Sequence, residues 1–169
     1  MGVVTTIQEI ISLDRPKPKV FSVKRKPFNS NEFEMVGVWS ILNAETDIRS
    51  TAMTELDIIK VQLVTIFSDG EKCVNGEERL KRLKTSDYIR LDSYIFLTLW
   101  ENKHLIPKSW EKKVESQNGR IFFDGHVFLC CDGYCYVLYL HRFNYEWLWG
   151  SCRIDRAFRA NDFSAVLAG

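Results

Sequence analysis

The chain has 169 residues, of which 46% are hydrophobic and 27% charged, a composition that fits one folded domain and excludes a disordered or collagen-like protein. Its 23 Lys and Arg side chains against 22 Asp and Glu leave a net charge of +1. No global field would therefore attract the molecule to nucleic acid or to an anionic membrane, and any such role needs a local patch.

The first 31 residues differ from the rest. Residues 1–13 are predicted to form a short amphipathic helix, and residues 14–31 a basic extended arm, because prolines block regular helix there. Lys24, Arg25 and Lys26 are candidates for contacts with nucleic-acid phosphates, although a solubilising linker is the favoured interpretation. We expect residues 32–169 to form a single domain. Because no signal peptide or long apolar run is present, we expect a cytoplasmic protein.

The middle of the chain begins with a predicted strand. Residues 55–67 are rich in β-branched side chains, which favours a strand. Asn75 is placed to cap a helix over residues 76–84, with acidic residues near its start and basic residues near its end.

Two further helices are predicted before residue 120. Asp92 is placed to cap a helix over residues 93–102, which is apolar nearly all round and is therefore expected to be buried. Pro107 suits the first turn of a short helix that continues to Lys113. Residues 117–119, Gln-Asn-Gly, are expected to end it.

From Arg120 the hydrophobic period changes to two, which predicts strands. Turns are expected at residues 124–125 and 132–133, and a closing strand at residues 164–168. In residues 147–149, Trp-Leu-Trp, the two indoles are expected to face one way and the leucine the other. The predicted fold class is thus α+β, with helices in the first two-thirds packed on a C-terminal antiparallel β-meander.

Catalytic and metal-binding motifs are weak. A zinc site is disfavoured because its cysteines lack two tight pairs. A Cys–His nucleophile pair, Cys135 with His126 or His141, is disfavoured because no third orienting group is marked. We predict a protein that is not an enzyme and has no catalytic residue, metal or cofactor. The cysteines considered for zinc are Cys130, Cys131, Cys135 and Cys152.

Two arrangements that act on nucleic acid are also disfavoured. Asp92, Glu101 and Lys103 resemble a nuclease Mg²⁺ site in residue type, but they lie along one predicted helix rather than at strand ends. Residues 76–84 and 91–102 are spaced like a helix-turn-helix, but the second helix is too apolar to reach base edges.

Residues 121–169 have an unusual composition. They contain no Lys and a single Glu, whereas the first 120 residues contain 12 Lys and 11 Glu. Lys, Gln, Glu, Met and Trp have no codon that ends in a pyrimidine, and residues 141–163 contain only three members of this set. Such a bias is expected where Asn codons are randomised at their adenines. Ordinary β-sheet composition, which also depletes Lys and Glu, is the competing explanation.

Several segments carry a resemblance that covers about residues 55–169. It rests on residues 96–110, Ile121–Gly125, Tyr136–Leu140, Trp147, Trp149 and Ser164–Ala168. In these segments the chain resembles a family of small proteins from uncultured bacteria of reduced genome, which look like target proteins of diversity-generating retroelements. The chain departs from the family pattern at Arg153, Phe158 and Phe163. The resemblance implies a hypervariable ligand-binding surface on a C-type-lectin-like scaffold.

The leading hypothesis is a display protein whose surface at residues 141–163 binds a protein or another macromolecule. Aromatic anchors beside short polar residues suit such a surface. Trp147 and Trp149 would form the fixed scaffold beneath it. The alternative is a small nucleic-acid-associated regulatory protein that uses the basic arm at residues 15–26. The predicted ligand-binding residues are Arg142, Phe143, Asn144, Tyr145, Leu148, Gly150, Ser151, Cys152, Asp155, Arg156, Phe158, Asn161, Asp162 and Phe163.

Overall fold

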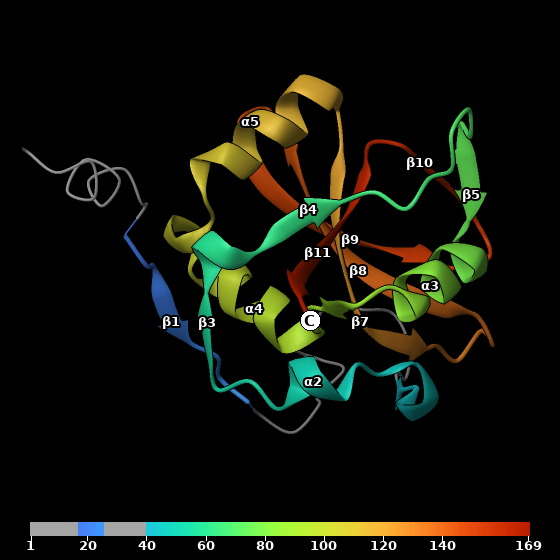
Figure 1. Ribbon diagram of the computed structural model, residues 1–169, viewed down its shortest axis with the longest axis horizontal. Helices are drawn as coiled ribbons and strands as arrows, with labels where there is room; N and C mark the ends of the chain where they lie inside the picture. The colour runs from blue at the N-terminus through green and yellow to red at the C-terminus, as the bar shows by residue number, and fades with distance from the viewer. Residues whose placement is uncertain (1–16, 26–39) are drawn as a thin grey trace, which may run out of the picture.

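The computed structural model describes residues 17–25 and 40–169 (Figure 1). The predicted helix at residues 1–13 and the basic residue Lys26 lie outside the described residues. The helices are α2 (Ile48–Thr51), α3 (Gly76–Thr85), α4 (Ser93–Glu101) and α5 (Lys108–Gln117), with 3-10 turns η2 (Asn43–Glu45), η3 (Ile58–Lys60) and η4 (Lys103–Leu105). The strands are β1 (Val20–Ser22), β2 (Ser40–Ile41), β3 (Glu55–Asp57), β4 (Gln62–Val64), β5 (Cys73–Asn75), β6 (Tyr88–Arg90), β7 (Arg120–Leu129), β8 (Cys135–Phe143), β9 (Glu146–Arg153), β10 (Ala157–Arg159) and β11 (Asp162–Ala168).

A seven-stranded, mostly antiparallel sheet forms the centre of the fold. Its main path runs β4-β11-β7-β8-β9, with β2 paired to β7 and β6 paired to β11. Two small antiparallel pairs, β1 with β3 and β5 with β10, lie beside it. The mixed α+β class is therefore confirmed.

The predicted capping residues mark one end of each of the three longer helices, although α5 continues to Gln117 instead of ending at Lys113. Asn75 Oδ1 accepts a hydrogen bond from the Glu77 amide at 2.8 Å at the start of α3. Asp92 Oδ1 accepts from the amides of Tyr94 and Ile95 at the start of α4. Asn118 adopts the left-handed conformation (φ 49°) that terminates α5. The Asn75 and Asp92 side chains satisfy backbone donors that a helix leaves unpaired at its start, and they fix its first turn.

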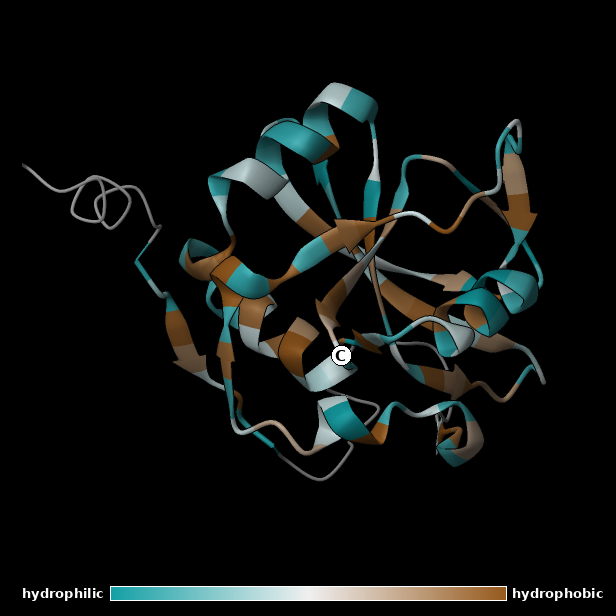
Figure 2. Ribbon diagram, in the orientation of Figure 1, coloured by the Kyte–Doolittle hydropathy of each residue, from teal (hydrophilic) through white to brown (hydrophobic). Residues whose placement is uncertain are grey.

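The sheet has two apolar faces of unequal size. The larger core holds the buried side of α4 and α5 against β7, β8 and Trp147 of β9. The smaller cluster joins α3 and the β5–β10 pair to the other face, through Phe122, Val137 and Phe158. Figure 2 shows that α4 is hydrophobic over most of its length, whereas α3 and α5 are largely hydrophilic. Of these three helices only α4 is therefore enclosed, as its composition predicts.

Two predicted local features are wrong. Residues 55–67 do not form one strand, because the Asp57 side chain accepts from the Ile59 amide and starts η3 there. Residues 124–125 form no turn. They lie within β7 at a shift of register, where the Gly125 amide bonds the Leu91 carbonyl at 2.8 Å rather than a neighbouring strand. In both places backbone groups form hydrogen bonds with partners outside the strand ladder, which explains both departures.

The C-terminal strand β11 does not close an antiparallel meander. It lies between β4 and β7, and it pairs with β7 in parallel. Its residues 162–166 are all buried, so this part of the strand is enclosed on both faces and does not alternate between core and solvent. The sheet therefore also draws β2, β4 and β6 from the first two-thirds of the chain.

Candidate functional site

Within residues 17–25 and 40–169, the hairpin between β8 and β9 carries the most exposed aromatic side chains. Phe143 pairs with Glu146, so only Asn144 and Tyr145 form the loop, with φ of 49° and 65°. Two central residues with positive φ define a type I′ turn, whose twist suits adjoining strands and whose second position favours glycine. Here that position holds Tyr145, which is 85% exposed, next to Phe143 at 63%.

Arg142 fastens this turn to α5. Its Nη2 donates to the Tyr145 carbonyl at 2.5 Å, and its Nε donates to Glu115 Oε1 at 2.7 Å. Its Nη1 lies 3.6 Å from the carboxylate of Glu111, and its guanidinium stacks over the Trp147 ring. The side chain is only 10% exposed. Although it was predicted to contact ligand, its main contacts hold the hairpin to the helix.

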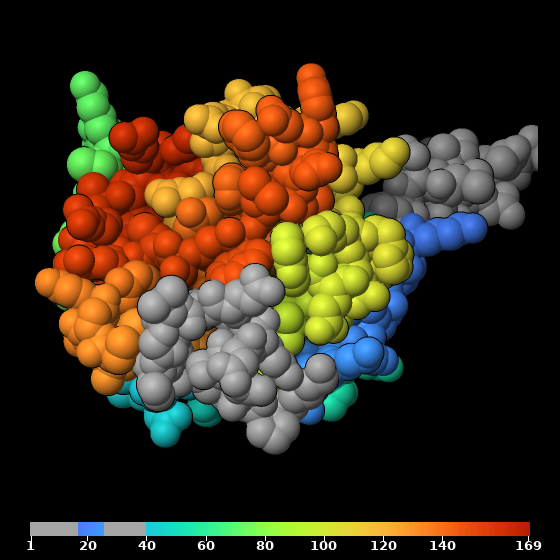
Figure 3. Space-filling view, turned by 180° about the vertical axis from the view of Figure 1, so that it is seen from behind, coloured from blue at the N-terminus to red at the C-terminus, as the bar shows by residue number. Residues whose placement is uncertain are grey.

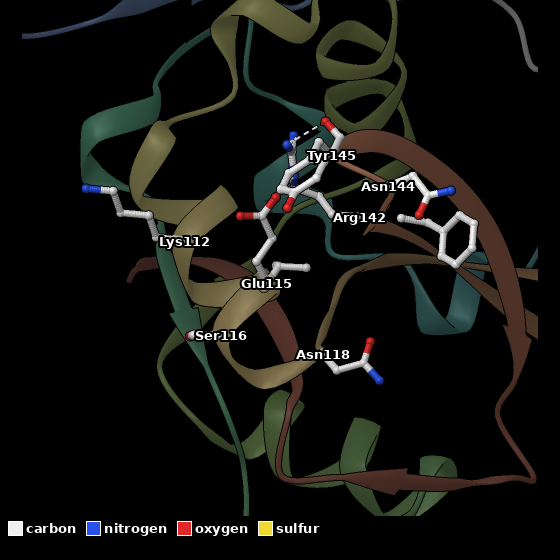
Figure 4. A pocket seen from close by; sticks show the side chains of 9 residues that line it. Lys112, Glu115, Ser116, Asn118, Arg142, Asn144 and Tyr145 are labelled. Carbon is white, nitrogen blue, oxygen red and sulfur yellow. Dashed lines mark hydrogen bonds and ion pairs between the residues drawn. The ribbon is translucent and has the colours of Figure 1, made fainter.

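An open groove of about 740 Å³ lies between the turn and the helix. Figure 4 shows Arg142 and Tyr145 close to Glu115, with Asn118 at the other end of the groove. In Figure 3 the hairpin projects at the upper edge of the molecule beside α5. The lining residues are Lys112, Val114, Glu115, Ser116, Asn118, Arg142, Phe143, Asn144 and Tyr145. We call the turn and this groove the tip surface.

The tip surface collects four consecutive residues of the predicted set, residues 142–145. The other members with solvent access are spread along β9 and the loops that follow. Leu148, Asp155 and Arg156 are exposed, whereas Ser151, Cys152 and Asn161 are half-buried. The structure therefore brings together part of the predicted site. The α5 residues that complete the tip surface gave no signal in the sequence beyond their place on a polar helix face.

Three predicted ligand-contact residues are buried, which corrects that assignment. Phe158 is 0% exposed and packs on Phe122 with ring centroids 4.9 Å apart. Phe163 is 3% exposed, and Asp162 is 2% exposed and pairs with Arg120 through two hydrogen bonds of 2.7 and 2.8 Å. These side chains point inward because β10 pairs with β5 and β11 pairs with β7. The spacing of residues in the sequence does not show these pairings.

Gly150 is also constrained by packing rather than open to ligand. A Cβ at this position would lie 2.6 Å from Cζ of Tyr139, directly across the β8–β9 pair. The Tyr139 ring is in turn covered by the Arg120 guanidinium at 5.1 Å. The absence of a side chain at residue 150 therefore makes room for Tyr139.

The two tryptophans of β9 lie on the core side of the sheet, as expected. Trp147 is buried, and Trp149 is half-buried with its ring 6.2 Å from that of Phe96 in α4. Leu148 points to the other face and is 37% exposed. This arrangement matches the prediction that the indoles form a scaffold.

The basic arm is partly built into the fold. Arg25 donates to the Asp92 carboxylate at 2.7 Å and to the carbonyls of Ser50 and Met53, so its guanidinium is engaged and does not suit a phosphate contact. Phe21 of β1 is buried in the larger core. Of the three basic residues proposed for nucleic acid, Lys24 is exposed and Lys26 lies outside the described residues.

The cysteines do not assemble. Cys130 and Cys131 have sulfur atoms 3.9 Å apart, and all four cysteines considered for zinc are free thiols. Within residues 17–25 and 40–169, no three His, Cys, Asp or Glu side chains lie so that they could hold a metal ion. Among the same residues, no helix is long and apolar enough to span a membrane.

A network of buried polar side chains was not predicted from the sequence. Arg79 pairs with Asp124 at 2.6 Å and bonds Ser164 Oγ at 2.5 Å, all three being buried. Nearby, Ser93 Oγ and His126 Nδ1 are 2.7 Å apart. Both are almost fully buried, so among the described residues this pair is a structural contact rather than an accessible nucleophile. Asp124 and His126 are isolated polar residues in an apolar sequence, which was the available signal, but the partners in these contacts are 33 to 85 residues apart.

Comparison of the chain with protein-family models, with curated proteins and with solved structures gave no match.

Proposed function

We propose that this protein is a non-enzymatic binding protein that recognises a protein partner through its tip surface. The observation that carries the proposal is Tyr145, an exposed aromatic residue in the left-handed region of a two-residue turn. A non-glycine residue in that region costs roughly 1 kcal/mol. Backbone strain of this kind concentrates at functional sites, where a side chain is needed for contact rather than for folding.

The chemistry of the tip surface supports a protein partner. Phe143 and Tyr145 offer large rigid apolar area at low entropy cost, and Asn144 offers adaptable hydrogen bonds. Arg142 anchors the turn to α5, so the aromatic side chains are presented by a fixed backbone. A preorganised surface loses less conformational entropy on binding than a mobile loop would.

The resemblance to retroelement target proteins supports a narrower diversified surface than the whole of residues 141–163. Phe158, Asp162 and Phe163 are needed inside the fold, and Gly150 is needed by Tyr139. In the proposal, variation is confined to positions with solvent access. These are Phe143, Asn144, Tyr145, Leu148, Ser151, Cys152, Asp155, Arg156 and Asn161.

Selection of binders tests the tip surface. Peptides would be selected from a displayed random library on the wild-type protein, and their affinity compared with a Phe143→Ser, Tyr145→Gly double variant. We expect a loss of about tenfold or more for most selected peptides, since central aromatic contacts dominate such interfaces. Ile48→Ser, which removes an exposed apolar side chain from α2, is the matched control. Peptides that bind the double variant as tightly as the wild type would contradict the proposal.

The origin of the varied surface has a separate test in the genome. We expect a reverse transcriptase gene near this gene, and a near-copy of its 3′ end that differs at adenines. The retroelement origin would be refuted if complete genomes held no such copy and if the adenine positions of the 3′ end were no more variable than the rest. The binding surface would then depend on its own test.

A further inference from the structure

A second recess, next to the end of α5, is predominantly polar. It has a volume of about 400 Å³, and Arg120, His141 and Arg159 line it from β7, β8 and β10. Asn118 lies between the recess and the groove and lines both. The recess is large enough for a small organic molecule rather than for a peptide segment.

The hydrogen-bonding groups in this recess are unevenly used. The Asp162 carboxylate accepts from Arg120 through both oxygens and also from the Arg159 amide at 2.8 Å. By contrast, the Arg159 guanidinium forms no ion pair with any residue of the described chain, and the His141 ring nitrogens have no hydrogen-bond partner there. The acceptor is therefore saturated while two donor groups remain available.

The side chains that line the recess carry a net positive charge. Arg120 and Arg159 carry two positive charges against the single negative charge of Asp162. The carbonyls of Gln117 and Asn118 at the end of α5, which would repel an anion, already accept from Asn161 Nδ2 at 2.9 Å each. The surroundings thus favour an acceptor-rich, negatively charged group.

We propose that this recess binds a small molecule through a tetrahedral oxyanion, a phosphate or sulfate group held by Arg159, His141 and Arg120. Guanidinium donors match such oxygens in geometry and charge. A tetrahedral group offers more acceptor oxygens to donors on three strands than a planar carboxylate does. This inference does not depend on the function proposed for the tip surface.

His141 adds a dependence on pH. Burial lowers the pKa of His141, and the positive charge of Arg120 lowers it further. The charged groups that line the recess with it are Arg120, Arg159 and Asp162, and the titratable Tyr139 ring packs against it with ring centroids 5.6 Å apart. A bound oxyanion favours the protonated imidazole, so affinity should rise as the pH falls toward and below 6.5. Sulfate is the suitable probe, because it keeps its charge over this range whereas phosphate does not.

The test is titration of the full-length protein with inorganic phosphate, inorganic sulfate, adenosine monophosphate and acetate, followed by NMR and calorimetry. We expect phosphate and sulfate to shift the amide signals of residues 118–120, 141 and 159, and acetate to bind at least about tenfold more weakly. A tighter adenosine monophosphate complex would identify an organic phosphate as the ligand class. Equal affinities for phosphate and adenosine monophosphate would identify the free anion.

Variants decide whether the recess is responsible. Arg159→Ala is expected to weaken phosphate binding about tenfold, and Arg159→Lys to restore part of it. Arg156→Ala removes the same charge from an exposed position outside the recess and is the matched control. His141→Asn should abolish the rise of sulfate affinity at low pH. The proposal is overturned if the four anions fail to bind, if acetate binds as well as phosphate, or if Arg159→Ala behaves as Arg156→Ala does.

Discussion

Arg79 of α3 and Asp124 of β7 form an ion pair that the fold encloses almost completely, with side chains 2% and 0% exposed. The guanidinium also stacks on Phe122 and Phe158 at 4.9 and 4.7 Å. This contact joins α3 to the irregular centre of β7.

Breaking this pair should be costly. Asp124→Asn is expected to lower the free energy of unfolding by about 3 kcal/mol, because it leaves a buried charge without compensation. Urea denaturation measures the effect. Glu71→Gln, which breaks the half-exposed pair of Glu71 with Arg82, is the control and should have a much smaller effect. Equal losses in the two variants would show that the enclosure of Arg79 is not energetically important.

Two phenylalanines of the predicted ligand-contact set should behave in opposite ways. Phe158→Ala is expected to cost about 3–5 kcal/mol because it empties a fully buried site, whereas Phe143→Ala should change stability by less than about 0.5 kcal/mol. Thermal and chemical unfolding of both variants check this. Comparable destabilisation by the two changes would contradict the assignment of Phe158 to the core and Phe143 to the surface.

Gly150 and Tyr139 should be coupled. Gly150→Ala is expected to destabilise the protein by about 1–2 kcal/mol, because the new Cβ meets the far end of the Tyr139 ring. In a Tyr139→Thr background the same change should be neutral or stabilising, since glycine is unfavourable inside a strand. A double-mutant cycle measures the coupling. Additive effects would rule out the contact as the reason for glycine at this position.

Tyr145 should separate stability from binding. Tyr145→Gly is expected to raise the free energy of unfolding by about 1 kcal/mol, because glycine adopts φ of 65° without strain. The same variant should bind selected peptides less tightly than the wild type. Tyr145→Ala serves as the control, since it removes the ring but keeps the strain. A loss of stability in Tyr145→Gly would mean that the ring supports the fold instead.

Protonation of His126 should destabilise the fold. Burial lowers its pKa, with the positive charges of Arg25 and Arg90 acting in the same direction and the negative charge of Asp92 opposing them. The unfolded chain therefore binds a proton at higher pH than the native state does. The stability contributed by neutral His126 is complete above about pH 6.5 and is lost as the pH falls toward its lowered native value.

Denaturation curves between pH 8 and pH 5 measure this loss. Half-buried His141 makes a smaller contribution to the pH dependence of stability, and His141→Asn removes it. In that background, His126→Asn should flatten the pH dependence of stability that remains. His104→Asn, at an exposed position after α4, is the control. A protein whose stability is constant over this range would contradict the burial of a neutral imidazole.

The sequence by itself determined where several helices begin or end. Asn75, Asp92 and Asn118 marked the ends of helices because capping is an interaction between near neighbours. The opposite orientations of Trp147 and Leu148 follow from the period of a strand, so they were also accessible from the sequence, whereas the Asn144-Tyr145 turn was not predicted.

The tertiary structure decided which exposed-looking residues are internal. Phe158 and Phe163 follow polar, loop-like stretches, yet β10 pairs with β5 and β11 enters the sheet beside β7, and these pairings join segments 42 to 86 residues apart. The partners of Arg79 and Arg120 are equally distant in the chain. Hydrogen bonds between distant strands and the burial of charge pairs depend on the whole packed molecule, so neither periodicity nor composition could assign them.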